Sequence, residues 1–110
     1  MLAEHSKCNS EYKNDKLYVS LSGEIDHHAA RAIREACDKE LDTREPSTLE
    51  INFSGVSFMD SSGIGLILGR VAVIQNIGAR LKVSGLSASQ MKIFRMAGIE
   101  KIKGVELVLK

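Results

Sequence analysis

The spacing of the apolar residues changes several times along the 110-residue chain, and this change restricts the fold more than any other feature. Leu17, Val19 and Leu21 alternate with polar residues, which is typical of a β-strand with one buried face. Further along, Ile33 and Cys37 recur at a four-residue spacing among charged residues, which is typical of an amphipathic helix. Strand patterns that alternate with helix patterns indicate an α/β fold.

The same patterns predict the order of the elements along the chain. The turn sequence KNDK predicts a hairpin between the first two strands, and Asp26 is a candidate N-cap of the first helix. The order β-β-α-β-α-β-α-β predicts a single domain over residues 1–110, with a small mixed sheet and helices packed against it. After a first strand that ends before Asn14, strands are expected at 17–25, 47–54, 80–85 and 105–110, and helices at 27–42, 62–77 and about 88–98, the last capped by Ser87 or Ser89.

The charge balance and the apolar runs exclude several classes of function. Fifteen basic and fourteen acidic residues leave a net charge of +1, so no strong field favours nucleic acid. The longest apolar run, residues 63–72, is broken by Arg70 and is shorter than the roughly 20 residues that span a membrane. Cys8 and Cys37 have no CxxC spacing and are expected to be reduced thiols. We therefore expect a cytoplasmic protein without metal, cofactor, or direct contact to nucleic acid or membrane.

The segment SFMDSSGIGLILGR, residues 57–70, joins a predicted strand to a predicted helix. Asp60, Ser61, Ser62 and Gly63 stand at the junction. The simplest interpretation is that the hydroxyl of Ser61 or Ser62 caps the helix while Gly63 permits a tight corner. Because such a cap needs one hydroxyl and no acid, this interpretation leaves Asp60 unexplained.

Two enzymatic interpretations of the junction have weak support in the residues. Residues 63–69 match a glycine pattern of dinucleotide sites, but the next strand does not end in the required acid. A serine nucleophile with His27 or His28 as its base is an alternative, yet the pattern GxSxG is absent. Adjacent histidines on a helix point about 100° apart, so they also make a poor metal pair. A small serine-dependent enzyme therefore remains a minor alternative.

The helix after the junction is apolar on two sides. One side is predicted to face the core. A second line, in which Leu66, Val73 and Ile77 surround Gly69, is either additional buried surface or a docking surface for a partner. The residues predicted on the core side are Ile64, Ile67, Leu68, Val71 and Ile74.

Phosphorylation is the interpretation that uses the acid, the hydroxyls and the apolar line together. A helix N-terminus tolerates a phosphate because of its free amides and partial positive charge. A phosphate would nevertheless add about −1.5 to −2 charge next to Asp60, beside the candidate docking surface. Such a change would expel a docked partner while the domain stays folded.

Two motifs carry a resemblance to a known family. GEIDHHAA at residues 23–30 and INFSGVSFMDSSGIGLILGR at residues 51–70 closely resemble the bacterial anti-sigma factor antagonists, which are STAS domains, and the sporulation type above all. The resemblance implies a protein without enzymatic activity that binds an anti-sigma factor, itself a serine kinase, and thereby frees a sigma factor. It implies that the kinase uses ATP to phosphorylate Ser61, that the complex then dissociates, and that a phosphatase restores the antagonist.

The resemblance also suggests where the partner binds. Asp26 matches a family position near the phosphorylation site, and we combine it with the junction and the second apolar line. Docking is expected to be transient, and a monomer is the simplest expectation. A different STAS signalling assembly, of the stress or biofilm type, is the main alternative, and relatives usually carry a helix after the last strand that this sequence does not show. The expected partner-binding residues are Asp26, Asp60, Ser61, Ser62, Gly63, Leu66, Gly69 and Val73.

Overall fold

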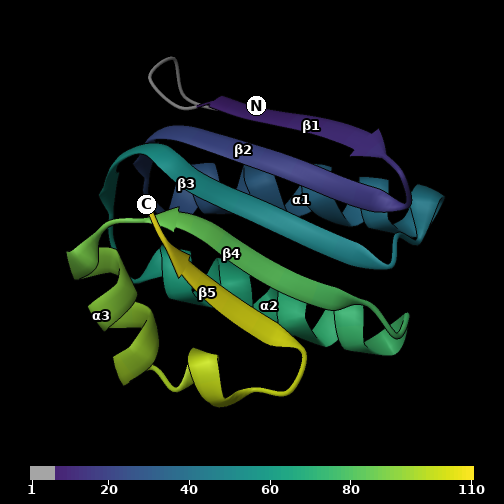
Figure 1. The fold of residues 1–110 in the computed structure, drawn as a ribbon. Coiled ribbons are helices and arrows are strands. Elements are labelled where there is room, and N and C mark those ends of the chain that lie inside the picture. Colours follow the sequence, from purple (N-terminus) through teal and green to yellow (C-terminus); the bar gives the residue numbers. More distant parts are fainter. Residues whose placement is uncertain (1–6) are drawn as a thin grey trace.

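The computed structural model describes residues 7–110, and Figure 1 shows their arrangement. The observed order of elements confirms the predicted β-β-α-β-α-β-α-β order, with one short 3-10 helix added before the last strand. In chain order the elements are β1 (Lys7–Lys13), β2 (Lys16–Ile25), α1 (His27–Arg44), β3 (Thr48–Met59), α2 (Ser62–Asn76), β4 (Arg80–Leu86), α3 (Ala88–Met96), η1 (Ile99–Lys101) and β5 (Val105–Leu109).

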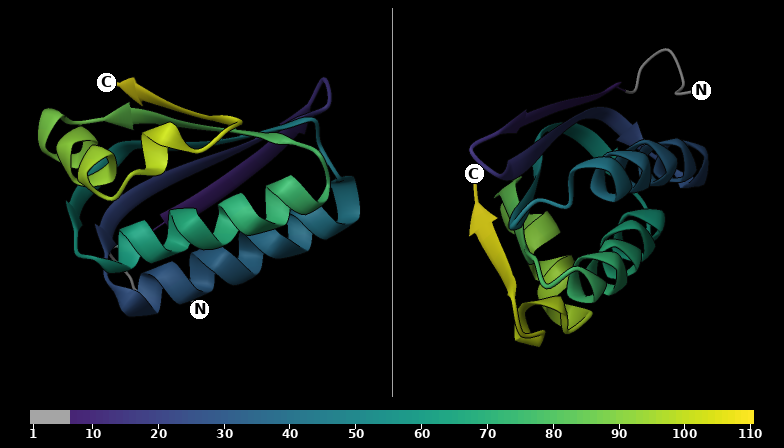
Figure 2. Two further views of the ribbon diagram at one scale, coloured as in Figure 1. Left: turned by 90° about the horizontal axis from the view of Figure 1, so that it is seen from below. Right: turned by 90° about the vertical axis from the view of Figure 1, so that its right-hand side faces the viewer.

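The five strands form one mixed sheet in the order β1-β2-β3-β4-β5. β1 and β2 are antiparallel and form the predicted hairpin, whose two-residue turn places Asn14 and Asp15 at positive φ of 53° and 63°. The other neighbouring pairs are parallel. Parallel crossovers share one hand, so strands in chain order carry their connecting helices on one side. Figure 2 shows α1 and α2 side by side against one face of the sheet.

The core lies between the sheet and these two helices. Alternate residues of β2, β3 and β4 point into it and meet the apolar sides of α1 and α2. α3 also contributes to the core, because the ring of Phe94 meets that of Phe53 edge to face, with 5.6 Å between the centroids. The largest fully buried side chains are Phe53, Phe94, Leu17, Ile25, Ile33, Leu41, Leu49, Ile51, Ile67, Ile74, Leu81 and Leu86.

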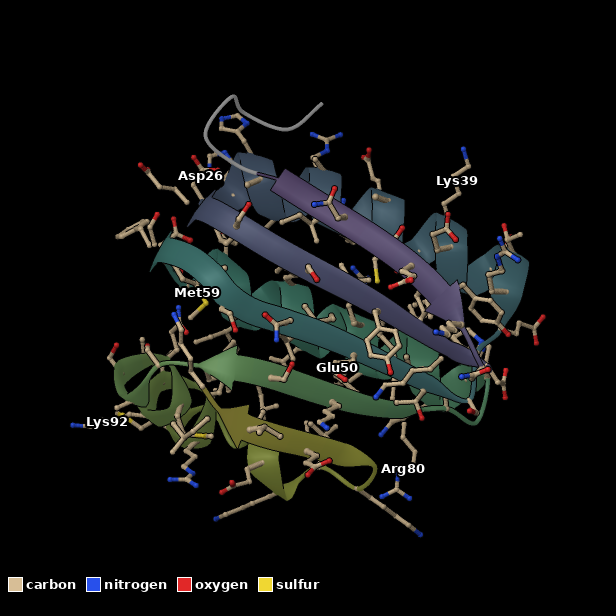
Figure 3. All side chains as sticks on the ribbon, turned by 45° about the horizontal axis from the view of Figure 1, so that its top comes forward. Asp26, Lys39, Glu50, Met59, Arg80 and Lys92 are labelled. Carbon is tan, nitrogen blue, oxygen red and sulfur yellow. The ribbon has the colours of Figure 1, made fainter. Side chains whose placement is uncertain are left out.

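The opposite face of the sheet carries a polar network instead of a covering helix. The Ser84 hydroxyl donates to Glu50 Oε2 at 2.6 Å, and Lys16 Nζ lies 2.9 Å from Glu50 Oε1. Figure 3 shows Glu50 in the middle of this face. Although partial burial opposes ionisation, these donors hold the pKa of Glu50 below its usual value. The network therefore satisfies the buried hydroxyl of Ser84.

The buried side of α2 differs from the prediction. Leu68, predicted in the core, is 41% exposed, whereas Leu66 is 5% exposed and Arg70 only 3%. The reason is the neighbouring helix. α1 packs against the side of α2 that carries Leu66 and Arg70, and the sequence of α2 alone does not show this contact. Arg70 crosses this contact, with its Nε 2.9 Å from Asp38 Oδ1 on α1, and burial lowers the pKa of its guanidinium.

Three smaller expectations can also be compared with the structure. Both Cys8 and Cys37 are free, as predicted, and burial raises the pKa of the Cys37 thiol to about 12. β3 continues to Met59, five residues beyond the predicted end of the strand. Within residues 7–110, no helix is long and apolar enough to cross a membrane.

Candidate functional site

The two sequence motifs meet at one end of the parallel part of the sheet. Ile25, the last residue of β2, is paired with Met59, the last residue of β3. The backbone N–H of Asp60 donates to the carbonyl of Ile25 at 3.2 Å and so fixes the two strand ends to each other. Figure 3 shows Asp26 and Met59 at this same end of the molecule. The start of α1 and the start of α2 are therefore neighbours.

Asp26 is the N-cap of α1, as predicted. Its backbone is extended (φ −97°, ψ −175°), and its Oδ1 accepts a hydrogen bond from the Ala29 N–H at 2.9 Å. This hydrogen bond lowers the pKa of the Asp26 carboxyl. The side chain is therefore committed to a structural role at the edge of the site.

The start of α2 is capped in a different way from the one predicted. Ser61 occupies the N-cap position, but its side chain makes no capping hydrogen bond. Instead Asp60 Oδ1 accepts from the Ser62 N–H at 2.8 Å, and the Asp60 carbonyl accepts from the Gly63 N–H at 3.0 Å. The expectation of a hydroxyl cap was wrong, because the carboxylate of the preceding residue accepts the hydrogen bond at the start of the helix.

This arrangement leaves the Ser61 hydroxyl unused. Ser61 is exposed, and within residues 8–110 its side chain has no hydrogen-bond partner. The backbone at this position is nevertheless fixed, since its carbonyl accepts from the Ile64 N–H at 3.1 Å and from the Gly65 N–H at 3.4 Å. A rigid backbone that carries an accessible hydroxyl suits a residue that another enzyme modifies.

Gly63 packs closely against the end of β3 as well as forming the tight corner. The residue is buried, and a Cβ added to it would overlap Cγ and Sδ of Met59. The glycine lets the first turn of α2 lie directly against the end of β3. Gly65 and Gly69 differ, because an added Cβ at either position would meet no atom within 4 Å.

The exposed face of α2 is not centred where the sequence predicted. Leu66 was expected at the middle of an exposed docking surface, but α1 covers it. Leu68 takes its place in solvent, between the open positions Gly65 and Ala72, and Gly69 and Val73 are half-buried beside it. Phe58, which is 52% exposed and precedes Asp60 by two residues, is a further exposed apolar residue near the junction. The partner-binding role of these residues remains a prediction.

A groove of about 430 Å³ runs between the first turns of α1 and α2. Sequence reasoning missed its basic character, although His27, Arg31 and Arg34 follow each other at helical spacing on α1. Across the groove lie Ser62 and Gly65 of α2. Its complete lining is His27, Ala30, Arg31, Arg34, Ser62, Gly65 and Leu66.

The histidines at the start of α1 are not arranged as a catalytic base for the serines. The rings of His27 and His28 lie beside each other, with their centroids 4.1 Å apart and their planes tilted by 35°. In the described part of the chain, no hydrogen bond connects either ring to the hydroxyl of Ser61 or Ser62, and no group of three or more His, Cys, Asp or Glu side chains is placed to hold a metal ion. The geometry thus shows a solvent-facing junction with a free hydroxyl.

The fold and this junction define a small α/β module with a mixed five-stranded sheet. The STAS domain model matches residues 8–109, and the chain belongs to the STAS domain family. Among its relatives, the anti-sigma F factor antagonist of Paenibacillus polymyxa is 34% identical over 92 residues, which are 84% of this chain and 79% of that protein. The anti-sigma-B factor antagonist of Listeria monocytogenes is 30% identical over 99 residues, which are 87% of this chain and 86% of the relative.

The solved structures of the anti-sigma factor antagonist SpoIIAA agree with this assignment. Its unphosphorylated form superposes with a TM-score of 0.74 at 29% identity, over 92% of this chain and 86% of that chain. The phosphorylated form from Bacillus also gives a TM-score of 0.74 at 29% identity, over 92% of this chain and 90% of the other. The predicted family and fold class are confirmed.

Proposed function

We propose that this protein is an anti-sigma factor antagonist whose binding is switched off by phosphorylation of Ser61. The observation that carries the proposal is the Ser61 hydroxyl, which is exposed and has no hydrogen-bond partner among residues 8–110, on a rigid corner beside an exposed apolar helix face. Relatives named as antagonists of anti-sigma F and anti-sigma-B factors support the class of partner. SpoIIAA, a structural relative, has been solved with and without phosphorylation.

In this proposal the unphosphorylated protein docks on an anti-sigma factor that is also a serine kinase, and so releases a sigma factor. The contact surface is the end of the sheet with Asp26, Asp60 and Ser61, continued along α2 by Leu68 and Val73. Phosphorylation with ATP adds about −1.5 to −2 charge beside the two carboxylates. A partner that buries this surface must then desolvate a dianion, so the complex dissociates. A serine phosphatase returns the protein to its binding form.

The protein itself is proposed to act by binding in the cytoplasm, as a monomer and without catalysis. The enzymatic alternative would require His27 or His28 to activate a junction serine, and the arrangement of the two rings beside each other does not favour it. The exposed position of Ser61 instead favours its use as the substrate of another enzyme.

A STAS module in another signalling assembly is the second candidate function. The relatives named as antagonists of anti-sigma F and anti-sigma-B factors make both kinds of anti-sigma factor candidate partners. Binding measurements with an anti-sigma factor of each type test both, and binding to neither would favour an assembly whose partner is not a sigma regulator.

The direct test is incubation with each candidate anti-sigma kinase and Mg-ATP, followed by intact-mass and peptide-mapping mass spectrometry. We expect one phosphate, confined to Ser61, and none on the Ser61→Ala variant. Ser62→Ala is the matched control and is expected to accept phosphate as the wild type does. Phosphate on Ser62 would overturn the residue assignment, and a stable complex without any phosphate would overturn the switch.

A further inference from the structure

The groove between α1 and α2 lies directly beside the proposed phosphorylation site. Figure 2 shows the two helices side by side along their length. Ser61 lies one turn above Gly65, whose N–H donates to the Ser61 carbonyl, and Gly65 lines the groove. A Cβ added to Gly65 would meet no atom within 4 Å, so the groove is open on the side of α2 that lies one turn from Ser61.

The opposite wall of the groove carries more positive charge than the surrounding acids neutralise. Arg31 is exposed and has one weak ion pair, with its Nε 3.6 Å from Glu35 Oε1. Arg34 has no ion pair within residues 8–110. Its natural helical partner would be Asp38, four residues later, but Asp38 is held by Arg70 from α2. The guanidinium of Arg34 is therefore available to an anion.

The nearby acids do not compete strongly for these arginines. The Asp26 carboxylate accepts from the Ala29 N–H, and that of Asp60 accepts from the Ser62 N–H. Arg31 and Arg34 line the groove together with Ser62, the residue that follows Ser61. The charged or titratable side chains that line the groove are thus those of His27, Arg31 and Arg34, all from α1.

We propose that this groove binds the phosphate of phosphorylated Ser61, with Arg34 and Arg31 as the main donors and His27 at the side. The proposal rests on the proposed function only in taking Ser61 as the modified residue. Guanidinium groups donate two parallel hydrogen bonds to a phosphate, and such charge-assisted pairs are the strongest of their kind. Bound in this way, the phosphate connects α1 to α2. The phosphorylated protein then has an ordered surface at this site, in addition to the charge that repels the partner.

The test installs phosphoserine at position 61 during translation with a phosphoserine-specific suppressor tRNA, so that no kinase is needed. Phosphorus NMR then follows the titration of the phosphate between pH 4.5 and 8. An exposed phosphoserine has a second pKa of about 6. We expect the phosphate on this protein to titrate lower by roughly half a pH unit or more, since nearby cations favour the dianion.

The variant Arg31→Gln/Arg34→Gln is expected to return the titration to that of an exposed phosphoserine. Lys39→Gln/Arg44→Gln is the matched control, because it removes the same two positive charges from the far half of α1 and is expected to change nothing. An unchanged phosphate pKa in the double variant, with amide spectra that show an intact fold, would overturn the proposal. Failure of every kinase to modify Ser61 would overturn the proposed function and leave this result standing.

Discussion

α1 and α2 begin side by side at the same end of the sheet, yet they satisfy their free amides in different ways. At α1 the N-cap side chain itself accepts a hydrogen bond, from the Ala29 N–H to Asp26. At α2 the N-cap is Ser61, a residue type that often caps helices, but the carboxylate of Asp60 accepts the hydrogen bond instead, from the Ser62 N–H. The fold therefore does not need the Ser61 hydroxyl. The acid before the serine accepts from the Ser62 N–H and so leaves the Ser61 hydroxyl without a capping role.

The largest expected effect is on partner binding. Ser61→Asp places a negative charge where phosphate would be added, and we expect affinity for the anti-sigma factor to fall by about 100-fold or more, or about 2.7 kcal/mol. The melting temperature should stay unchanged, because the side chain of Ser61 takes no part in the fold. Isothermal titration calorimetry measures the affinity. Ser87→Asp, at the N-cap of α3, is the control and should bind as the wild type does, and equal binding by Ser61→Asp would contradict the switch.

A second pair of variants compares the two glycines of the first turn of α2. Gly63→Ala should destabilise the protein by about 1–3 kcal/mol, since the new Cβ overlaps Met59 at the end of β3. Gly65→Ala should stabilise it by about 0.5–1 kcal/mol, because the new methyl group meets no atom and the helix gains propensity. Urea unfolding measures both changes. If the two variants had equal stability, close packing of the corner on Met59 would not be the reason for Gly63.

A third pair of variants compares the stability that serine contributes at the N-caps of α3 and α2. Ser87 forms a capping box in α3, in which its hydroxyl accepts from the Gln90 N–H at 3.1 Å and the Gln90 side chain accepts from the Ser87 N–H at 2.9 Å. Ser87→Ala should therefore cost about 1 kcal/mol. Ser61→Ala should cost no more than about 0.3 kcal/mol, since no capping bond is lost. Thermal unfolding of both variants checks this, and a loss at Ser61 as large as that at Ser87 would mean that its hydroxyl does cap the helix.

The sequence predicts features whose causes are local. The hairpin turn at Asn14 and Asp15, the N-cap at Asp26 and the alternation of Leu17, Val19 and Leu21 each depend on a few adjacent residues, and all are found in the structure. The motif at residues 57–63 also marks its own position, since a strand pattern changes there to a helix pattern. These features needed no knowledge of which elements become neighbours.

The features that the sequence did not predict depend on contacts between elements. The exposure of Leu68 and the burial of Leu66 and Arg70 follow from the side on which α1 packs, which a helical wheel of α2 does not contain. The basic groove likewise exists only because Arg34 of α1 faces Gly65 of α2. The capping role of Asp60 was missed because serine and aspartate are both good N-caps, and only the backbone geometry decides between them.

The smallest expected effect concerns pH and again contrasts two helix starts. The hydrogen bond from Ala29 lowers the pKa of Asp26 in the folded protein, whereas an unfolded aspartate titrates near 3.9. The stability from this charge is therefore fully present above about pH 4 and is lost as the pH falls through the folded pKa. We expect the stability difference between the wild type and Asp26→Asn, which keeps a capping oxygen, to shrink between pH 6 and pH 3 in urea unfolding. The difference caused by Ser87→Ala should stay constant over that range, because a serine hydroxyl does not titrate, so a parallel decline in both pairs would show that the Asp26 charge is not its cause.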